Sequence, residues 1–433
     1  MPTPVLAGYP GRARSTHLRL AVAGLAACLL VPACARKASQ VRLDQTHAAR
    51  SSNARLASDA AARGIPFRLV DDQIVLSVTI NGRVSVDMVL DTGFGSEGVL
   101  LLDPELGRRV GLEYVQSVQL GGGGSSEGTA AHVAVGATLD LPGVTFSNQP
   151  LVVLDDGSGC ADWPVKGIIG GTLMARPVEI DYEARVLHIL GTLPDPPSGL
   201  GEALGLTFVQ GIPAVRATVV TEKGQEVPVE LLVDTGTNDA LLLRPGSHPQ
   251  LRLPERVIAG TSGVLGEGLG GGMKGSLGRV AGLRFGHFSF DQVVTVFLDE
   301  EAMGTASTLG GNGLLANEVL QRFTVVFDYA GKRLFLRPNS SYPRPFEFDM
   351  AGLVLQARGD GSFTVLDVIQ QSPAARQGLA GGDVLVAIDG KDVRALASEA
   401  VFSMLRQLGR HVEITIDRGG TRLTRTVTLA RLI

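Results

Sequence analysis

The chain has 433 residues, of which 44% are hydrophobic and 19% charged, and its formal net charge is −4. This composition excludes an intrinsically disordered chain and predicts roughly two to four folded domains. A slightly acidic chain gives no electrostatic reason to expect a nucleic-acid partner. No internal disulfide is expected, because Cys28 and Cys34 lie near the N-terminus and leave Cys160 alone in the folded part.

The N-terminal segment has the pattern of a secretory signal. Arg12, Arg14 and Arg19 precede an apolar run, residues 20–32. That run is shorter than the roughly 17–25 residues that a membrane-spanning helix needs. A basic start, a short apolar run and small residues at its end predict export, with residues 1–35 as the signal peptide. Residues 36–64 are rich in Ala, Ser and Arg, and we expect them to form a flexible tether.

The end of the signal contains two cysteines that could carry a lipid. Residues 31–34, Val-Pro-Ala-Cys, resemble the processing site of bacterial lipoproteins, which favours lipidation of Cys34. Cys28 is the alternative, and ordinary signal cleavage beside Cys34 also fits the small residues there. The resemblance implies a location in the bacterial cell envelope or periplasm, with a lipid anchor in the membrane.

Two copies of one strand pattern follow. Asp91-Thr92-Gly93 comes directly after an apolar segment, and Asp234-Thr235-Gly236 comes after another. An apolar segment ending in a small residue follows each motif, at 167–170 and 313–316. The nearly equal spacing of the two pairs indicates an internal duplication. Alternating patterns and turn signals predict strands at residues 73–80, 84–90, 131–141, 144–154, 178–181, 186–190, 213–220, 227–233, 280–285, 290–298, 324–328 and 333–336.

Asp-Thr-Gly after a strand, with an apolar segment later in the same unit, resembles the aspartic proteases. Each unit is similar to one retropepsin subunit, and the resemblance covers about residues 65–338. It implies a mainly β fold with two closed lobes, residues 65–193 and 194–340, related by a pseudo-two-fold axis. Both lobes lie in one chain, so the catalytic pair could form within it.

The resemblance also implies roles for the motif residues. Asp91 and Asp234 would share one proton, and the ionised member would activate a water for attack on a peptide bond. Thr92 and Thr235 would hydrogen-bond across the seam, while Gly93 and Gly236 would let backbone approach the carboxylates. Taken alone, either motif could equally be an ordinary Asp-Gly turn. Phe94 and Ala316 depart from the family pattern, which places smaller residues at both positions.

Glycine-rich segments follow each motif at similar distances. In retropepsins such hairpin tips are the flaps that fold over substrate. The resemblance therefore implies flaps, which contain Gly121, Gly122, Gly123, Gly124, Gly270, Gly271 and Gly272. The alternative is a pair of loops without fixed structure.

The last segment, residues 346–433, has a different pattern. Residues 372–393 closely resemble a bacterial PDZ domain, which is a small α+β fold that binds peptides along a strand edge. The resemblance implies that Ala351, Gly352 and Leu353 hold the peptide carboxylate. The alternative is that the groove packs against the protease lobes.

The favoured interpretation is an exported aspartic endopeptidase with a PDZ domain for substrate or partner peptides. The alternative is a non-catalytic peptide-binding scaffold of the envelope. No cofactor and no metal are expected, because the seven histidines show no ligand spacing. The expected partners are a peptide or protein substrate, a PDZ ligand peptide and the membrane. Because both motifs precede residue 346, we expect cleavage of short peptides without the PDZ domain.

Overall fold

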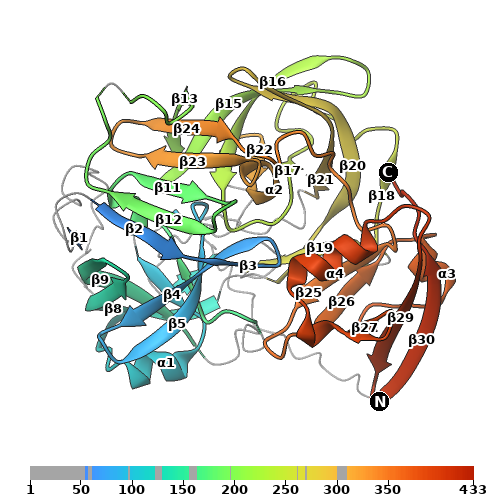
Figure 1. The fold of residues 1–433 in the computed structure, drawn as a ribbon, viewed down its shortest axis with the longest axis horizontal. Helices are drawn as coiled ribbons and strands as arrows, with labels where there is room; N and C mark the ends of the chain where they lie inside the picture. The colour runs from blue at the N-terminus through green and yellow to red at the C-terminus, as the bar shows by residue number, and fades with distance from the viewer. Residues whose placement is uncertain are drawn as a thin grey trace, which may run out of the picture.

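The computed structural model describes residues 54–56, 61–95, 98–121, 129–155, 163–195, 197–260, 262–268, 271–299 and 310–433. Within these residues the chain is mainly β, and its strands form two nine-stranded and two six-stranded sheets. Figure 1 shows the first lobe in blue and teal, the second in lime and gold, and the C-terminal domain in orange and red. The prediction of a mainly β fold is confirmed.

The first nine-stranded sheet forms the first lobe, and its strands follow the order β1-β9-β6-β10-β5-β4-β8-β7, with β3 paired to β4. Its strands are β1 (Ala54–Leu56), β3 (Arg68–Val70), β4 (Gln73–Ile80), β5 (Val84–Leu90), β6 (Val99–Leu101), β7 (Tyr114–Leu120), β8 (Thr129–Leu141), β9 (Val144–Leu154) and β10 (Gly167–Ile169). Helix α1 (Pro104–Arg109) begins where the Asp103 carboxylate accepts a hydrogen bond from the Glu105 amide. Pro104 suits the first helical position because it has no amide hydrogen to leave unpaired.

The second nine-stranded sheet repeats this pairing in the second lobe. In each lobe, the strand that ends at the Asp-Thr-Gly motif has two neighbours. In the first lobe this strand is β5, which pairs antiparallel with β4 and parallel with β10. In the second lobe it is β16, which pairs antiparallel with β15 and parallel with β22. The pseudo-two-fold axis itself stays a prediction. The elements of this lobe are β14 (Thr207–Val209), β15 (Ile212–Val220), β16 (Glu226–Asp234), β17 (Leu241–Leu243), β18 (Val257–Ile258), β19 (Val264–Gly268), β20 (Gly271–Phe285), β21 (Phe288–Leu298), β22 (Gly313–Ala316) and helix α2 (Asn317–Leu320).

A six-stranded sheet joins the two lobes in the order β13-β24-β23-β11-β12-β2. Its centre is the antiparallel pairing of β11 with β23, so that each lobe contributes one central strand. In Figure 1 these strands lie one below another at the left. The two hairpins predicted to close separate lobes therefore form one shared sheet. Its strands are β2 (Ala61–Pro66), β11 (Val178–Asp181), β12 (Val186–Leu190), β13 (Glu202–Gly205), β23 (Phe323–Asp328) and β24 (Arg333–Pro338).

The expected tether of residues 36–64 is too long at its C-terminal end. Strand β2 begins at Ala61 and pairs with β12, and residues 54–56 pair with β9 as β1. Ala62 and Ile65 are buried there. The local sequence has few residues that favour strands, so that the partner strand decides its conformation. The rest of the expected tether and signal, including Cys28 and Cys34, lies outside the described residues.

The C-terminal domain is a separate sheet with the order β25-β26-β27-β29-β30, in which β25 is an edge strand. Ser372 caps helix α3 by accepting from the Ala375 amide at 3.1 Å, as its sequence predicts. The elements of this domain are β25 (Leu353–Ala357), β26 (Phe363–Val368), α3 (Pro373–Arg376), β27 (Val384–Ile388), β28 (Lys391–Asp392), α4 (Ser398–Leu405), β29 (His411–Arg418) and β30 (Thr421–Thr428).

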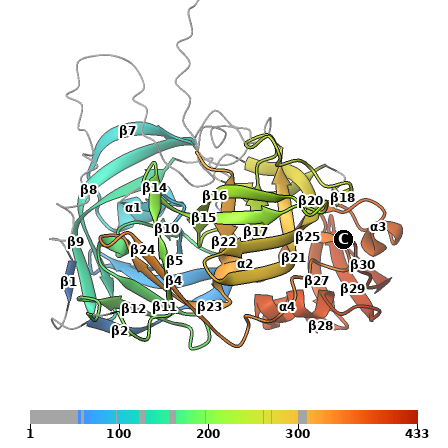
Figure 2. The same ribbon diagram turned by 90° about the horizontal axis from the view of Figure 1, so that it is seen from above.

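The C-terminal domain has its own apolar core, but its edges contact the two lobes. Phe346 is buried in the core of the lobes, and the Arg322 guanidinium lies 3.6 Å from the centre of its ring. Arg279 of β20 donates to the Ile433 carbonyl at 3.2 Å. Figure 2 shows the domain beside β20 and β21 of the second lobe.

Among the described helices, none is long and apolar enough to cross a membrane.

Candidate active site

The two Asp-Thr-Gly loops meet where β5 and β16 end. The Asp91 amide donates to the Ile169 carbonyl at 3.0 Å, and Asp234 lies in register with Ala316 of β22. A Cβ on Gly170 would lie 2.7 Å from the Phe94 carbonyl oxygen, so that the first lobe needs glycine there. The second lobe accommodates Ala316, which is fully buried. The backbone around Ala316 thus leaves room for a methyl group, whereas the backbone around Gly170 does not.

The two threonines hold the loops together by reciprocal hydrogen bonds. The Thr92 amide donates to Thr235 Oγ1, and the Thr235 amide donates to Thr92 Oγ1, both at 3.1 Å. Each hydroxyl in turn donates to a carbonyl of the opposite lobe, Thr92 to Val233 at 2.7 Å and Thr235 to Leu90 at 2.8 Å. All four bonds are buried, which fixes the relative position of the loops.

Asp91 and Asp234 lie close together at this seam, near enough for the charge of Asp234 to act on Asp91. Their exposures are 4% and 1%. A Cβ on Gly93 would lie 2.6 Å from Asp234 Cγ, and one on Gly236 would lie 2.3 Å from Asp91 Cγ. Any larger residue at either glycine would therefore push the carboxylates apart.

The two carboxyl groups have unequal surroundings. Burial and the nearby Asp234 charge raise the pKa of Asp91 well above its ordinary value. Burial also raises the pKa of Asp234, but the Gly236 amide and the Thr237 hydroxyl, at 2.8 and 3.0 Å, oppose this rise. Two carboxylates in contact resist ionising together, so the pair holds its last proton to a higher pH than a free aspartate would. The donors around Asp234 favour the proton on Asp91.

Phe94 is buried beside the pair without offering a hydroxyl. Its amide donates to Asp91 Oδ1 at 2.9 Å. Its ring packs in an apolar cluster of the first lobe that includes Val89 and Leu100. The large residue at this position thus serves the core of its lobe, while its backbone holds the carboxylate.

Sequence reasoning missed two residues near the pair. The Gln73 side-chain amide donates to the Gly236 carbonyl, which connects the first lobe to the loop of the second. Tyr329, in the turn between β23 and β24, has a raised pKa because of burial and the charges of Asp91 and Asp234. Neither residue belongs to a motif, so that no signal in the sequence could identify them.

Further carboxyl groups lie near the residues that follow the second Asp-Thr-Gly motif. Burial and the Asp72 charge raise the pKa of Asp71 to about 7, although the Asn238 side chain hydrogen-bonds it. Burial and the Glu318 charge raise the pKa of Asp239 to about 7. These side chains therefore gain protons in the neutral range without belonging to the Asp91–Asp234 pair.

The predicted flaps are described in part. Gly121 follows β7, while Gly122, Gly123, Gly124 and Gly270 lie outside the described residues. Gly271 and Gly272 begin β20, which pairs with β19 to form the second hairpin. The role of these glycines in substrate binding stays a prediction.

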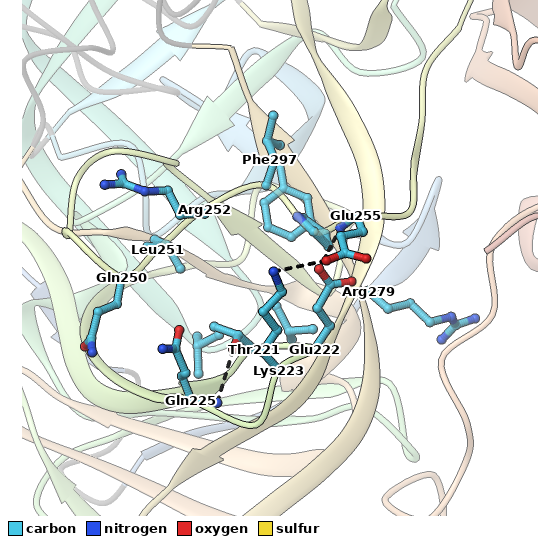
Figure 3. A pocket seen from close by; sticks show the side chains of 14 residues that line it. Thr221, Glu222, Lys223, Gln225, Gln250, Leu251, Arg252, Glu255, Arg279 and Phe297 are labelled. Carbon is cyan, nitrogen blue, oxygen red and sulfur yellow. Dashed lines mark hydrogen bonds and ion pairs between the residues drawn. The ribbon is translucent and has the colours of Figure 1, made fainter.

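Two pockets lie away from the Asp pair. Figure 3 shows one of about 190 Å³ on the second lobe, where Lys223 forms an ion pair with Glu255 at 3.0 Å. The other, of about 500 Å³, lies at the junction of both lobes with the C-terminal domain and is lined by Arg185, Glu318 and Arg406 among others. Neither Asp91 nor Asp234 lines either pocket.

Within the described residues, no group of three or more His, Cys, Asp or Glu side chains is arranged to hold a metal ion.

The loop predicted to hold a peptide carboxylate already binds one from the chain itself. The Gly352 and Leu353 amides donate to Asp349 Oδ1 at 2.5 and 2.9 Å. Asp349 is 6% exposed, and burial raises its pKa to about 6. The neighbouring elements are also in contact with the lobes, because β3 packs against α4 and β19 packs against β25. These contacts favour the alternative that the groove packs against the lobes.

Comparison with known proteins identifies two domains. Residues 76–173 match the family described as Aspartyl protease, and residues 347–429 match the family described as PDZ domain. The chain therefore contains an aspartyl protease family domain followed by a PDZ domain, as the sequence resemblance predicted. The first match includes Asp91, while Asp234 lies beyond it. Domains of these families bind peptides or proteins.

Among solved structures, a chain titled photosystem II D1 C-terminal processing protease is similar at 24% identity, with a TM-score of 0.19. The match covers 20% of this chain and 24% of that chain. No curated protein matches the sequence.

Proposed function

We propose that the chain is an aspartic endopeptidase in which Asp91 and Asp234 activate a water molecule. The observation that carries the proposal is the close approach of two buried carboxyl groups from separate lobes. Burying two like charges is costly unless they share a proton. A scaffold that only binds peptides has no need for such a pair, whereas general acid–base catalysis does.

The proposed reaction begins with the ionised carboxylate taking a proton from water as the water oxygen attacks the peptide carbonyl carbon. The protonated carboxyl donates to the carbonyl oxygen, so that a neutral tetrahedral diol forms. Proton transfer to the amide nitrogen then allows the C–N bond to break, which releases a carboxylic acid and an amine. The amides of Phe94 and Gly236 and the Thr237 hydroxyl hold the carboxyl groups in place throughout.

The test is cleavage of an unfolded protein by the purified chain lacking residues 1–35, with Asp91→Asn and Asp234→Asn as variants. A fragment that began at residue 65 would remove most of β2, so the longer chain is the better sample. We expect each variant to lose turnover by at least about a hundredfold while its melting temperature stays near that of the wild type. Cleavage by either variant at the wild-type rate would refute the pair, and inactive wild-type protein would favour the non-catalytic scaffold.

We also propose that the protein is exported and anchored in the membrane through Cys34. The proposal rests on the basic start, the short apolar run and the Val-Pro-Ala-Cys sequence. Mass spectrometry of the mature N-terminus in a bacterial host tests it. An acylated Cys34 supports the proposal, an acylated Cys28 moves the anchor, and an unmodified chain starting beyond Cys34 excludes the anchor.

A further inference from the structure

The PDZ domain is bonded to the base of the β19–β20 hairpin of the second lobe. Asp367, at the end of β26, accepts hydrogen bonds at 2.8 Å from both the amide and the hydroxyl of Ser262. Two residues further on, Ile369 forms a β-bridge with Gly260, and the Gln370 amide donates to the Ala259 carbonyl at 3.1 Å. The residues that follow β26 are therefore paired with the segment that leads into β19.

This contact is closely fitted. Asp367 is 2% exposed, and its other oxygen accepts from the Val368 amide at 2.8 Å. A Cβ on Gly260 would lie 2.0 Å from Asp367 Oδ2, so that a side chain there is incompatible with the present position of the carboxylate. A buried carboxylate that accepts three hydrogen bonds is strongly held. The contact therefore fixes the segment around Ser262 to the PDZ domain.

The fixed segment controls where the hairpin starts. Ser262 lies two residues before β19, and the Gly275 amide of β20 donates to the Gly263 carbonyl at 3.1 Å. The hairpin also packs along β25 and β26. A shift at Ser262 would therefore move both strands of the hairpin together.

We propose that Asp367 is a positioning residue for substrate binding, because it holds the β19–β20 hairpin in place from the PDZ domain. The proposal rests on the proposed peptidase function and on the prediction that the β19–β20 hairpin is a flap that folds over substrate. The PDZ domain then forms part of the framework of the active site, in addition to any peptide that it binds. Asp367 itself touches neither the substrate nor the reacting atoms.

The experiment compares Gly260→Ala and Ser262→Ala with the wild-type chain. Gly260→Ala forces Asp367 away, and Ser262→Ala removes the hydroxyl, which is one of the two donors that Ser262 offers to Asp367. Both changes lie outside the PDZ core, so that the fold of that domain should survive. Gly205→Ala is the matched control, because a Cβ there meets nothing within 4 Å, and Ser262→Thr is the conservative variant that keeps the hydroxyl.

We expect hydrogen exchange of the amides of residues 262–268 to accelerate about tenfold or more in Gly260→Ala, and less in Ser262→Ala. The KM for a short peptide should rise about tenfold in Gly260→Ala, with a smaller change in kcat, since the loss is in substrate positioning. Gly205→Ala and Ser262→Thr should match the wild type in both measurements.

Each other outcome is decisive. Unchanged exchange in Gly260→Ala would overturn the anchoring role of Asp367. Faster exchange with an unchanged KM would overturn its role in substrate binding. If the wild type cleaves no peptide, the peptidase function fails and the substrate role fails with it, whereas the exchange measurement still decides whether Asp367 anchors the hairpin.

Discussion

Thr235 shows how much of the site depends on single buried hydroxyl groups. Its Oγ1 donates to the Leu90 carbonyl and accepts from the Thr92 amide, so that one atom satisfies two buried backbone groups of the opposite lobe. Thr235→Val keeps the shape and removes both bonds. Unpaired buried groups cost about 1–3 kcal/mol each, so we expect a loss of about 2–5 kcal/mol in the free energy of unfolding.

Urea unfolding measures this loss. Thr207→Val is the control, because the Thr207 hydroxyl bonds Glu230 at an exposed site and should change stability by no more than about 0.5 kcal/mol. A loss for Thr235→Val as small as that of the control would mean that the reciprocal threonine bonds do not hold the lobes together.

Thr237 should set the acid limb of the pH profile. Its hydroxyl donates to Asp234 and lowers the pKa of that carboxyl against the effect of burial. Thr237→Val removes this donor, so the pKa of the ionised carboxyl rises and that carboxyl becomes protonated at a higher pH. In a profile of kcat/KM measured on one soluble peptide, we expect the acid limb to move up by about one pH unit.

Thr237→Ser keeps the hydroxyl and should keep the acid limb of the wild type. An acid limb that stays in place in Thr237→Val would show that Asp234 is not the carboxylate that must be ionised. The first lobe supplies an amide from Phe94 where the second supplies this hydroxyl, which is why the two aspartates are expected to titrate unequally.

Among the elements, those whose patterns are local were predictable. Strands β4, β5 and β9 have the predicted bounds because alternating apolar residues and the Asn81-Gly82 turn define them without reference to other parts of the chain. The aspartates were predictable because a duplicated motif marks them. The shared six-stranded sheet was not, since β2 has weak strand propensity and β11 pairs with a strand from the other lobe. Gln73 was missed for the same reason, because its partner is distant in sequence.

The carboxylate loop of the PDZ domain gives a prediction at this scale. Asp349 occupies the Gly352 and Leu353 amides that a peptide terminus would need. Asp349→Ala frees both donors, so we expect affinity for a peptide with a free C-terminus to rise about tenfold. Fluorescence anisotropy should show no such gain for the same peptide with an amidated end.

Asp360→Ala is the matched control, because Asp360 caps the Ser362 amide in an exposed turn of the same domain. Lower pH should act in the same direction as the Asp349 variant, since protonation of a carboxyl with a pKa of about 6 weakens its hold on the amides. Equal gains for free and amidated peptides would mean that the loop does not receive the terminus.

At the scale of the whole molecule, the PDZ domain is too closely joined to the lobes to be an independent attachment. Phe346 fills part of the lobe core, Glu399 of α4 pairs with Arg185 at 2.7 Å, and Asp367 holds Ser262. The expectation that short peptides are cleaved without residues 346–433 stays a prediction. These contacts favour the opposite outcome, in which deletion of residues 346–433 impairs cleavage of short peptides as well as of proteins, because it removes the contacts from the lobes.

The packing of lobes and PDZ domain also predicts how stability depends on pH. Burial raises the pKa of Asp71 and Asp239 to about 7 and that of Asp349 to about 6, all above the ordinary value of 3.8. Between pH 4 and pH 7 the folded chain therefore binds more protons than the unfolded chain. Stability must then fall as pH rises through this window and be greatest on its acid side. We expect the midpoint of urea unfolding to be higher at pH 5 than at pH 8.

Asparagine variants separate these groups from the Asp91–Asp234 pair. Asp71→Asn and Asp239→Asn keep the shape and remove the titration, so the combined variant should gain stability mainly at pH 8 and flatten the profile. Asp360→Asn serves as the control, because hydrogen bonds to Ser362 lower the pKa of this exposed carboxyl and it stays ionised throughout the window. A wild-type midpoint that falls from pH 8 to pH 5 would contradict the prediction. It would mean that these carboxyl groups reach water in solution, and that the lobes and the PDZ domain are less closely packed around them.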